Sequence, residues 1–345
     1  MIKKILYFSF TFTLLMFHQQ AFAQLDRSTS KVGTTAAQFL KIGAGARAIG
    51  MGGTYTAISN DIYSVYYNPA GVANTTGTGQ VAFNHADWLA SINYDFAALS
   101  INLPEFGTLF FSLTSLSVPE DKVRTFDFPE GDGRVWDASS LAIGAGFAKK
   151  LTENFAIGFH AKFIREAIWN TSASGFAIDV GTYYVTPFND LVIGASISNF
   201  GSKMQLEGRD ILFNSDPNNN QNTGPNNILS RYETDKFDIP LTFRIGLAMD
   251  VLKERYFRTT VAVDATHPND NTEYVNSGLE LAYDEMAFLR VGYKSLFLRD
   301  SEQGLTFGGG LKYSFNSQFT LFVNYGWADY GRLNNVQFFD VGIGF

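Results

Sequence analysis

The chain has 345 residues, no cysteine, and 33 acidic against 26 basic residues, a formal net charge of −7. The missing cysteines exclude disulfides, thiolate catalysis and thiolate metal sites, and the acidic balance argues against a nucleic-acid partner. Aromatic residues make up 15% of the chain, and glycine is plentiful at 32 residues. This mixture suits strands with one apolar face and one small or polar face.

Residues 1–23 predict a secretory signal peptide. Lys3 and Lys4 precede the apolar run Ile5 to Phe17, and Ala21-Phe22-Ala23 supplies a small-x-small cleavage pattern. The alternative is a membrane anchor, but a run of about 13 residues is short for the roughly 20 that a spanning helix needs. No other apolar run approaches that length, so a membrane location would have to use strands.

Residues 24–80 are predicted to form an N-terminal plug, or hatch. Thr34 and Thr35 can cap a short helix through Ala36 to Leu40. Gly43-x-Gly45-x-x-Ala48 superficially fits a dinucleotide fingerprint, but no βαβ pattern surrounds it. The small residues of this stretch favour close packing against the inside of a barrel instead.

Residues 81–345 alternate apolar and polar side chains in the manner of strands. About 14 such segments start near residues 81, 92, 108, 138, 155, 175, 191, 240, 257, 274, 287, 304, 319 and 336. Their connections alternate between short turns and longer links, which include residues 118–136 and 201–239. The pattern predicts an all-β protein, a transmembrane antiparallel barrel with both termini on the periplasmic side.

A soluble β-sandwich is the competing interpretation, because it also alternates apolar and polar residues. The predicted strands run about 10 to 12 residues, as tilted membrane strands do, rather than the five or six common in globular sheets. Aromatic residues also cluster where short turns meet strands, as in a girdle at the membrane boundary. These residues are Phe106, Phe155, Phe188, Phe257, Phe288, Phe315, Phe319 and Phe345.

The chain ends in the alternating residues Phe339, Val341, Ile343 and Phe345. An unpaired last strand would be an aggregation-prone edge, so we expect it to pair with the first strand and to face lipid. A terminal Phe on alternating apolar residues also resembles the signal read by the barrel assembly machinery. Outer-membrane lipid and that machinery are therefore expected partners.

The sequence predicts no catalytic residue, metal site or cofactor. His85, His160 and His267, the histidines outside the signal peptide, lie in no recognisable catalytic motif and show no paired spacing for a metal. Charges of both signs fall on the predicted lumen face, which favours internal salt bridges holding the plug over an ion-selective pore. They are Lys162, Asp179, Arg244, Asp250, Arg258, Asp264, Glu280, Arg290, Lys294, Lys312 and Asp340.

Two stretches carry a family resemblance: "FLKIGAGARAIGMGG", with Arg47, Gly50, Met51 and Gly52, and "SNDIYSVYYNPAGVA", with Asn68, Pro69, Ala70 and Gly71. Followed by the amphipathic strands, they resemble the PorV/PorQ family, within the broader FadL-like barrels. The second stretch resembles the N-terminal hatch of that superfamily. The resemblance implies the outer membrane of a Gram-negative bacterium and a part in type IX secretion, in which PorV captures the C-terminal signal domain of cargo.

Two functions stay open at this point. The first is a non-enzymatic barrel whose outer loops bind a secretion translocon or secreted cargo; the alternative is a FadL-like transporter of hydrophobic small molecules such as fatty acids. For the first, residues 201–239 form the largest loop, and the apolar residues around its Asn-rich centre are expected to pack into a cap over the barrel mouth. These residues are Met204, Leu206, Ile211, Leu212, Phe213, Ile228, Leu229 and Tyr232.

Overall fold

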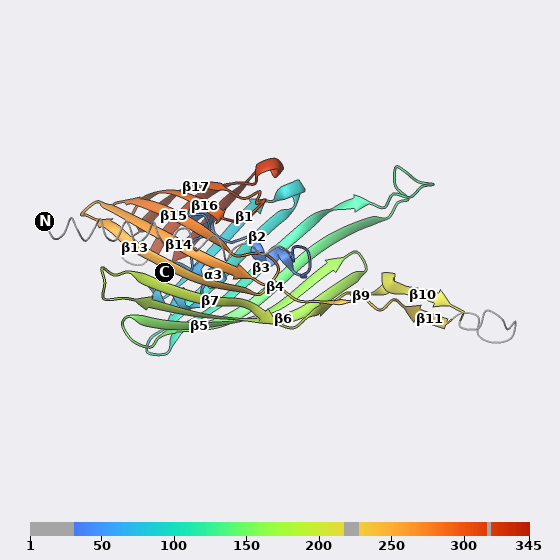
Figure 1. Ribbon diagram of the computed structural model, residues 1–345, viewed down its shortest axis with the longest axis horizontal. Coiled ribbons are helices and arrows are strands. Elements are labelled where there is room, and N and C mark those ends of the chain that lie inside the picture. Colours follow the sequence, from blue (N-terminus) through green and yellow to red (C-terminus); the bar gives the residue numbers. More distant parts are fainter. Residues whose placement is uncertain (1–30, 217–227, 316–318) are drawn as a thin grey trace.

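The computed structural model describes residues 31–216, 228–315 and 319–345. In these residues, fourteen long antiparallel strands form a closed barrel whose strands slant across Figure 1. They are β1 (Gly79–Asp87), β2 (Asn93–Leu103), β3 (Gly107–Lys122), β4 (Val135–Lys150), β5 (Phe155–Ile168), β6 (Thr171–Val185), β7 (Val192–Gly201), β13 (Thr242–Lys253), β14 (Phe257–Pro268), β15 (Tyr274–Tyr283), β16 (Ala287–Leu296), β17 (Leu305–Phe315), β18 (Phe319–Asp329) and β19 (Asn335–Gly344). The predicted fold class is confirmed. The predicted signal peptide lies outside the described residues.

Each barrel strand pairs with its neighbours along the chain, and β19 pairs with β1 to close the ring. The closing register runs from Gln80 opposite Gly344 to Asp87 opposite Gln337. Beyond the end of β19, Phe345 N donates to Gly79 O at 2.9 Å. The last strand is therefore paired on both sides, and its backbone groups are not left open to lipid or to another chain.

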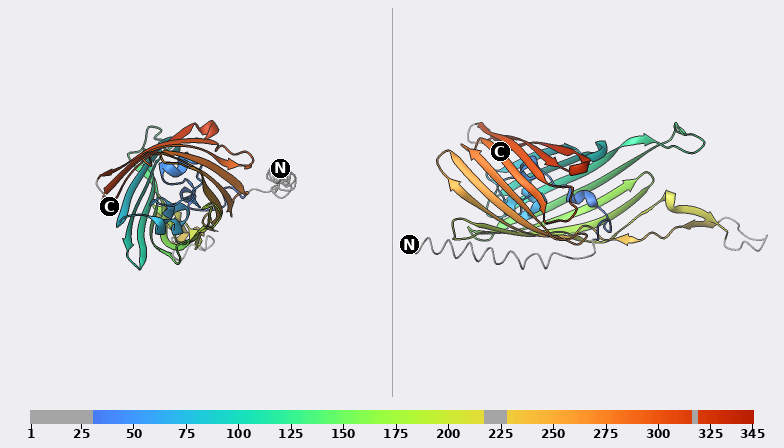
Figure 2. Two further views of the ribbon diagram at one scale, coloured as in Figure 1. Left: turned by 90° about the vertical axis from the view of Figure 1, so that its left-hand side faces the viewer. Right: turned by 45° about the horizontal axis from the view of Figure 1, so that its top comes forward.

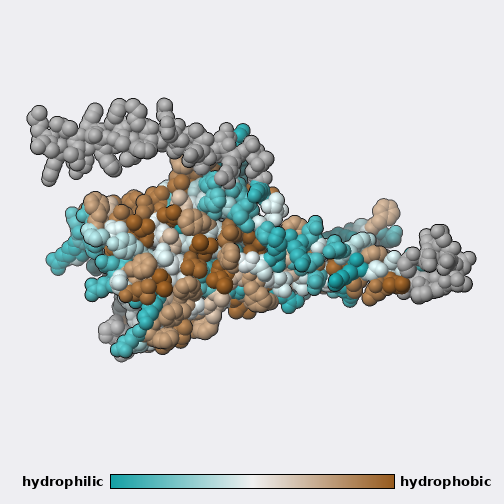
Figure 3. All heavy atoms as spheres, turned by 60° about the horizontal axis from the view of Figure 1, so that its bottom comes forward, coloured by the Kyte–Doolittle hydropathy of each residue, from teal (hydrophilic) through white to brown (hydrophobic). Residues whose placement is uncertain are grey.

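Alternation along the strands separates a lipid face from a lumen face. On β13, Phe243, Ile245 and Leu247 are 40–44% exposed, whereas Thr242 and Ala248 are buried. Figure 3 shows apolar side chains gathered over the barrel strands and polar ones toward the two ends. In the described part of the chain, no helix has the length and apolar character needed to cross a membrane.

One member of the predicted aromatic girdle faces the other way. Phe288 is 9% exposed and lies on the lumen face of β16, with the Arg290 guanidinium 5.1 Å from its ring centroid. The turn Asp284–Met286 places Ala287 outward and Phe288 inward, and strand alternation then decides its face. Phe106, Phe188 and the other fully exposed members do lie on the outside.

The two ends of the barrel differ in their connections. β3 and β4 extend past the other strands, so residues 118–122 and 135–136, expected in a loop, are strand, and the link is only 123–134. The described residues of the 201–239 segment, 201–216 and 228–239, contain five short strands: β8 (Met204–Gln205), β9 (Glu207–Gly208), β10 (Leu212–Ser215), β11 (Ile228–Arg231) and β12 (Lys236–Phe237). Both segments project from the same end, at the right of Figure 1. Short turns mark the periplasmic end of such barrels, so this is the outer end.

Before β1, most of the described residues 31–78 lie inside the barrel, as the view along the barrel in Figure 2 shows. These described residues contain four short helical elements: η1 (Gln38–Lys41), α2 (Ala46–Gly50), α3 (Ser64–Tyr67) and η2 (Pro69–Asn74). The expected threonine cap is wrong, because Ala37 precedes η1 without any side-chain cap. The Thr35 hydroxyl instead donates to Asp270 on the barrel, at 2.9 Å. Thr35 Oγ1 thus donates to a carboxylate of the barrel instead of accepting from a backbone N–H of the helix.

We predict that deleting residues 341–345, or replacing Phe345 by Asp, sharply lowers the amount of folded barrel in the membrane. Deleting residues 341–345 removes half of the residue pairs between β1 and β19. Phe345→Asp puts a charged side chain at the boundary of the lipid. Heat-modifiable gel mobility and membrane abundance measure the effect. Wild-type abundance of both variants would contradict a role of Phe339, Val341, Ile343 and Phe345 in assembly.

Candidate functional site

The plug touches the barrel wall backbone to backbone. A Cβ atom added at Gly326 would lie 2.8 Å from Ala46 O, and one added at Gly50 would lie 2.8 Å from Gly308 Cα. Eight strands present a lumen glycine to the plug in this way: Gly158, Gly181, Gly194, Gly246, Gly278, Gly292, Gly308 and Gly326. This glycine belt lets the plug approach more closely than any side chain would allow.

The residues of the two family motifs lie within this contact. Gly50, Met51 and Gly52 meet the wall glycines of β15, β16 and β17. Asn68 donates to Thr56 O at 2.7 Å and to Thr182 O at 2.9 Å, and its own oxygen accepts from Ala70 N at 3.1 Å. Asn68 thus joins two parts of the plug to β6 and caps η2, which follows it.

Arg47, the charged residue of the first motif, belongs to an ionic cluster around Glu280. The fully buried Glu280 carboxylate accepts from Arg47 Nε at 2.9 Å, from Arg290 Nε at 2.7 Å and from Arg258 Nη2 at 3.1 Å. Arg47 also pairs with Asp61 of the plug at 2.9 Å. Sequence alternation places Arg258, Glu280 and Arg290 on the lumen face, but only the fold brings the plug arginine to them.

Wall carboxylates also accept hydrogen bonds from the plug backbone. Asp264 Oδ2 accepts from the amides of Tyr55 and Thr56, both at 3.0 Å. Asp340 Oδ2 accepts from Ala46 N at 2.7 Å. These bonds satisfy plug amides that have no partner within its short helical elements, so the buried polar backbone is compensated by the wall.

A further anchor holds the start of the plug at the outer end. Asp270, in the link between β14 and β15, accepts from Thr35, from Gln38 Nε2 at 2.8 Å and from Lys41 Nζ at 2.7 Å. Burial by itself would raise the pKa of Asp270, but the hydrogen bonds from Gln38 and Lys41 outweigh it and hold the pKa below its ordinary value. Asp270 is therefore ionised at neutral pH, and the Lys41 ion pair is formed.

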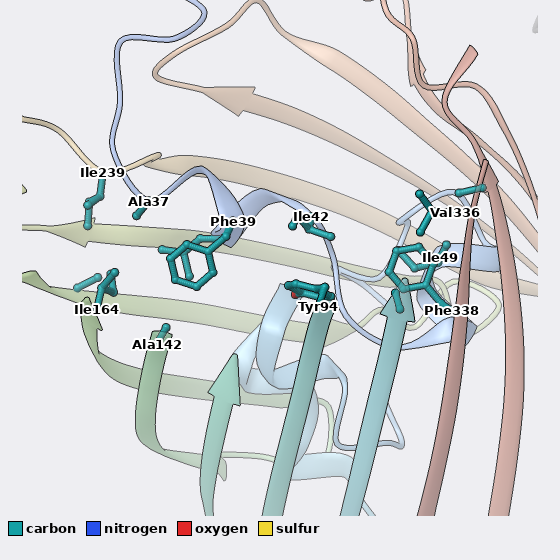
Figure 4. Packing of buried hydrophobic residues seen from close by; sticks show 14 of the residues in the cluster. Ala37, Phe39, Ile42, Ile49, Tyr94, Ala142, Ile164, Ile239, Val336 and Phe338 are labelled. Carbon is teal, nitrogen blue, oxygen red and sulfur yellow. The ribbon is translucent and has the colours of Figure 1, made fainter. Parts of the chain in front are cut away.

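Deeper in the barrel than this anchor, apolar side chains of the plug pack against apolar side chains of the wall. Figure 4 shows Phe39 beside Ile164 and Ala142, which come from the lumen faces of β5 and β4. Tyr94, Ile49 and Phe338 belong to the same buried cluster. The lumen of the described barrel thus holds an apolar layer toward the outer end and the Glu280 cluster toward the short turns.

A serine, a histidine and an aspartate lie in hydrogen-bonded order inside the lumen, an arrangement the sequence does not reveal. Ser112 Oγ is 2.9 Å from His160 Nε2, and His160 Nδ1 is 3.1 Å from Asp179 Oδ2. Lys162 Nζ also contacts Asp179 at 2.8 Å. The neighbouring cavity is only about 20 Å³, which is room for about one water molecule and not for a substrate. We therefore interpret the group as a structural hydrogen-bond network.

The other histidines pair with acids on the barrel. His85 Nδ1 lies 2.7 Å from Asp95 Oδ1, and His267 Nδ1 lies 2.9 Å from Glu273 Oε1. Both histidines are partly exposed on strands. Among the described residues, no group of three or more His, Asp or Glu side chains is arranged to hold a metal ion.

The eight apolar residues of the candidate partner loop separate into two groups. Met204 is 1% exposed and packs with Ile164 and Ala173, and Leu206 packs against the same cluster. The other six do not form the expected cap, because they lie on or beside the β10–β11 hairpin, which extends beyond the barrel mouth in Figure 1. The pairing of β10 with β11 holds them away from the wall, which sequence alone cannot show.

The six hairpin residues are largely exposed and face both ways. Leu212 and Leu229 lie on one face of the hairpin, and Phe213 and Ile228 lie on the other. All four are 37–66% exposed. Tyr232 stacks on Phe213 with a centroid distance of 4.5 Å. The hairpin is thus an apolar projection from the outer end.

A closed fourteen-strand barrel with an apolar outer band and a filled lumen defines an outer-membrane protein. Residues 25–269 match the family model described as type IX secretion system protein PorV. The chain therefore belongs to the PorV family. No curated protein matches its sequence.

Solved structures with the same fold are FadL-like barrels. A Pseudomonas aeruginosa FadL homologue has 10% identity and a TM-score of 0.51, over 87% of this chain and 97% of its own. The Pseudomonas putida toluene transporter TodX has 12% identity and a TM-score of 0.53, with 87% and 97% covered. The Ralstonia pickettii toluene transporter TbuX has 11% identity, the same TM-score of 0.53, and the same coverage of 87% and 97%. At such low identity the likeness establishes the FadL-like fold alone.

We predict that Glu280→Gln loosens the plug. The substitution keeps the size of the side chain but removes the buried carboxylate that Arg47, Arg258 and Arg290 share. Breaking a buried ion pair costs roughly 3–5 kcal/mol. The midpoint of heat modification should fall, and protease should reach the plug. Glu302→Gln is the matched control, because Glu302 pairs with the exposed Arg332 and such surface pairs contribute roughly 0–1 kcal/mol. If the two variants have the same heat-modification midpoint and the same protease access, the Glu280 cluster does not hold the plug.

A second prediction concerns the glycine belt. The Cβ atom of Gly292→Ala would overlap the backbone of Gly52 and push the plug away from β16. Gly309→Ala on the adjacent strand is the control, because its Cβ would meet only Phe288 O at 3.8 Å. We expect lower thermal stability and faster plug proteolysis for Gly292→Ala only. The prediction fails if both alanine variants match the wild-type protein.

Proposed function

We propose that this protein is a non-enzymatic component of type IX secretion that binds a protein partner, the translocon or its cargo, at the outer end. The single observation that carries the proposal is the exposed β10–β11 hairpin with apolar side chains on both faces. Membership of the PorV family supports the assignment to this pathway. Residues 1–23 would direct export and would then be removed.

The hairpin is not expected to be stable in water without a binding partner. Two-stranded hairpins are marginally stable by themselves, and this one has four residues in each strand. Its apolar side chains point to opposite faces, so packing against a single flat surface would leave one face wet. A partner that contacts both faces would bury Leu212, Phe213, Ile228 and Leu229 together.

The arm formed by residues 118–137 offers a second contact surface beside the hairpin. Phe126 and Phe128 at its tip are 101% and 58% exposed. The arm carries six acidic residues and three basic ones, a net charge of −3. We propose that arm and hairpin contact the same partner, because both leave the outer end of the barrel (Figure 1).

The contacts of the plug favour this function over transport of a hydrophobic small molecule. A path through the lumen would require residues 35–78 to leave the glycine belt and the Glu280 cluster together. Binding at the outer end requires no such rearrangement. The FadL-like likeness is one of fold, and TodX and TbuX are named as toluene transporters in their own right.

We predict that replacing residues 209–232 by a short Gly-Ser linker leaves a folded barrel that no longer co-purifies with its partner. Met204 and Leu206 remain in the variant, so the cluster beneath the loop is preserved. Heat-modifiable mobility reports folding, and quantitative mass spectrometry of cross-linked purifications reports the partner. An unchanged partner yield would contradict the proposal. Uptake of a fatty acid into liposomes by the wild-type protein would favour the transporter instead.

A further inference from the structure

An apolar pocket opens at the outer mouth, beside the base of the arm and apart from the hairpin. Its volume is about 280 Å³, and it lies between the inward faces of β3–β6 and the short strands β8 and β12. Its lining includes Leu116, Val118, Ala138, Ile168, Leu206 and Phe237. We call it the mouth pocket.

The inward faces of β3 and β5 change character at this height. Deeper in the barrel they carry Ser112, Thr114, His160 and Lys162, as expected for a polar lumen. Toward the outer end the same faces continue with Leu116 and Val118 on β3 and with Ile164, Glu166 and Ile168 on β5. The inward faces are therefore mainly apolar at the outer mouth, and Glu166 is their charged exception.

This apolar surface is not closed by the rest of the molecule. Ile168 is 54% exposed and Phe237 is 47% exposed, although both line the pocket. Met204, which pairs with Phe237 across β8 and β12, also lines the pocket but is only 1% exposed. A concave apolar surface open to water is a common mark of a binding site.

The charges around the mouth pocket select its occupant. Glu166 lines the pocket, and one of its oxygens accepts from Ala37 N at 2.9 Å. The adjoining arm has a net charge of −3. These acids disfavour the anionic headgroup of an outer-leaflet lipid and favour a cationic group beside an apolar one.

We propose that the mouth pocket receives an apolar side chain of the partner protein, from a segment in which Lys or Arg flanks that side chain. The inference rests on the proposed function, because it supposes that the partner held by the hairpin also reaches the base of the arm. The hairpin and the arm would hold the partner, and the mouth pocket would bind one of its side chains and so determine specificity. A volume of about 280 Å³ lies just below the range of small-molecule sites, which suits one or two side chains.

Site-specific cross-linking in the full-length protein tests the inference. Photoreactive p-benzoylphenylalanine is placed at Phe237, inside the pocket, and as a control at Leu333, an exposed apolar residue between β18 and β19. Mass spectrometry then identifies the cross-linked atoms. We expect a partner peptide with an apolar residue next to Lys or Arg at Phe237, and none at Leu333. A cross-link to a lipid acyl chain or to residues 209–232 of the same chain overturns the proposal.

Substitutions block the pocket by independent means. Ile168→Asp makes its wall polar, Ala138→Phe fills it without adding polarity, and Glu166→Gln removes the charge while keeping the acceptor for Ala37 N. We expect the first two to lower the Phe237 cross-link about tenfold, as the loss of one buried apolar side chain predicts. We expect Glu166→Gln to make the yield of the Phe237 cross-link less dependent on salt concentration. Leu333→Asn should change neither the yield nor its salt dependence.

The outcomes separate this inference from the function on which it rests. If the pocket variants keep the full partner yield while removal of residues 209–232 abolishes it, the mouth pocket is not a binding site and the proposed function stands. If neither change affects partner yield, both are wrong. Heat-modifiable mobility of each variant establishes that the barrel has folded before binding is compared.

Discussion

The structure depends on one close fit, the contact of the plug backbone with a belt of wall glycines. Gly292 and Gly326 admit Gly52 and Ala46 at distances that leave no space for a side chain. At such separations solvent is excluded, so plug amides without a partner inside the plug must find one on the wall. Asp264 and Asp340 meet that need, and Glu280 gathers three arginines from plug and barrel. The fit and the buried charges therefore require each other.

A filled lumen moves function to the ends of the barrel. The described chain shares its fold with barrels named as toluene transporters, but its plug packs closely against the lumen wall and leaves a polar cavity of about 460 Å³ at the short-turn end, beside Arg47, Arg258 and Arg290. What remains free is the outer end, where β3 and β4 lengthen into the arm and where β10 and β11 form the hairpin. The barrel thus anchors the protein in the membrane, and its exposed apolar side chains outside the lipid face lie at the outer end, in water.

Alternation of apolar and polar residues predicted the barrel well, because each strand has one face toward lipid and the other toward the polar lumen. The predicted starts near residues 155, 257, 274, 287 and 319 coincide with the observed ones. Errors occurred where that constraint ends. Phe288 lies at a strand start, where a single residue of register decides the face, and residues 118–122 lie beyond the membrane, where β3 and β4 continue on their own pairing. The expected cap failed for the same reason, because hairpin pairing decided where Leu212 and Leu229 point.

The sequence by itself determined the strand number, the lipid face, the lumen charges and the presence of an internal segment, because alternation and composition record the surroundings of each residue directly. It could not determine which charges meet. Arg47 and Glu280 are far apart in the chain, and closure of the barrel around the plug brings them within hydrogen-bond distance. The pairing of β3, β4 and β5 does the same for Ser112 and His160. The mouth pocket is of the same kind. Its walls come from four strands and the 201–239 loop, so its shape exists only in the folded molecule.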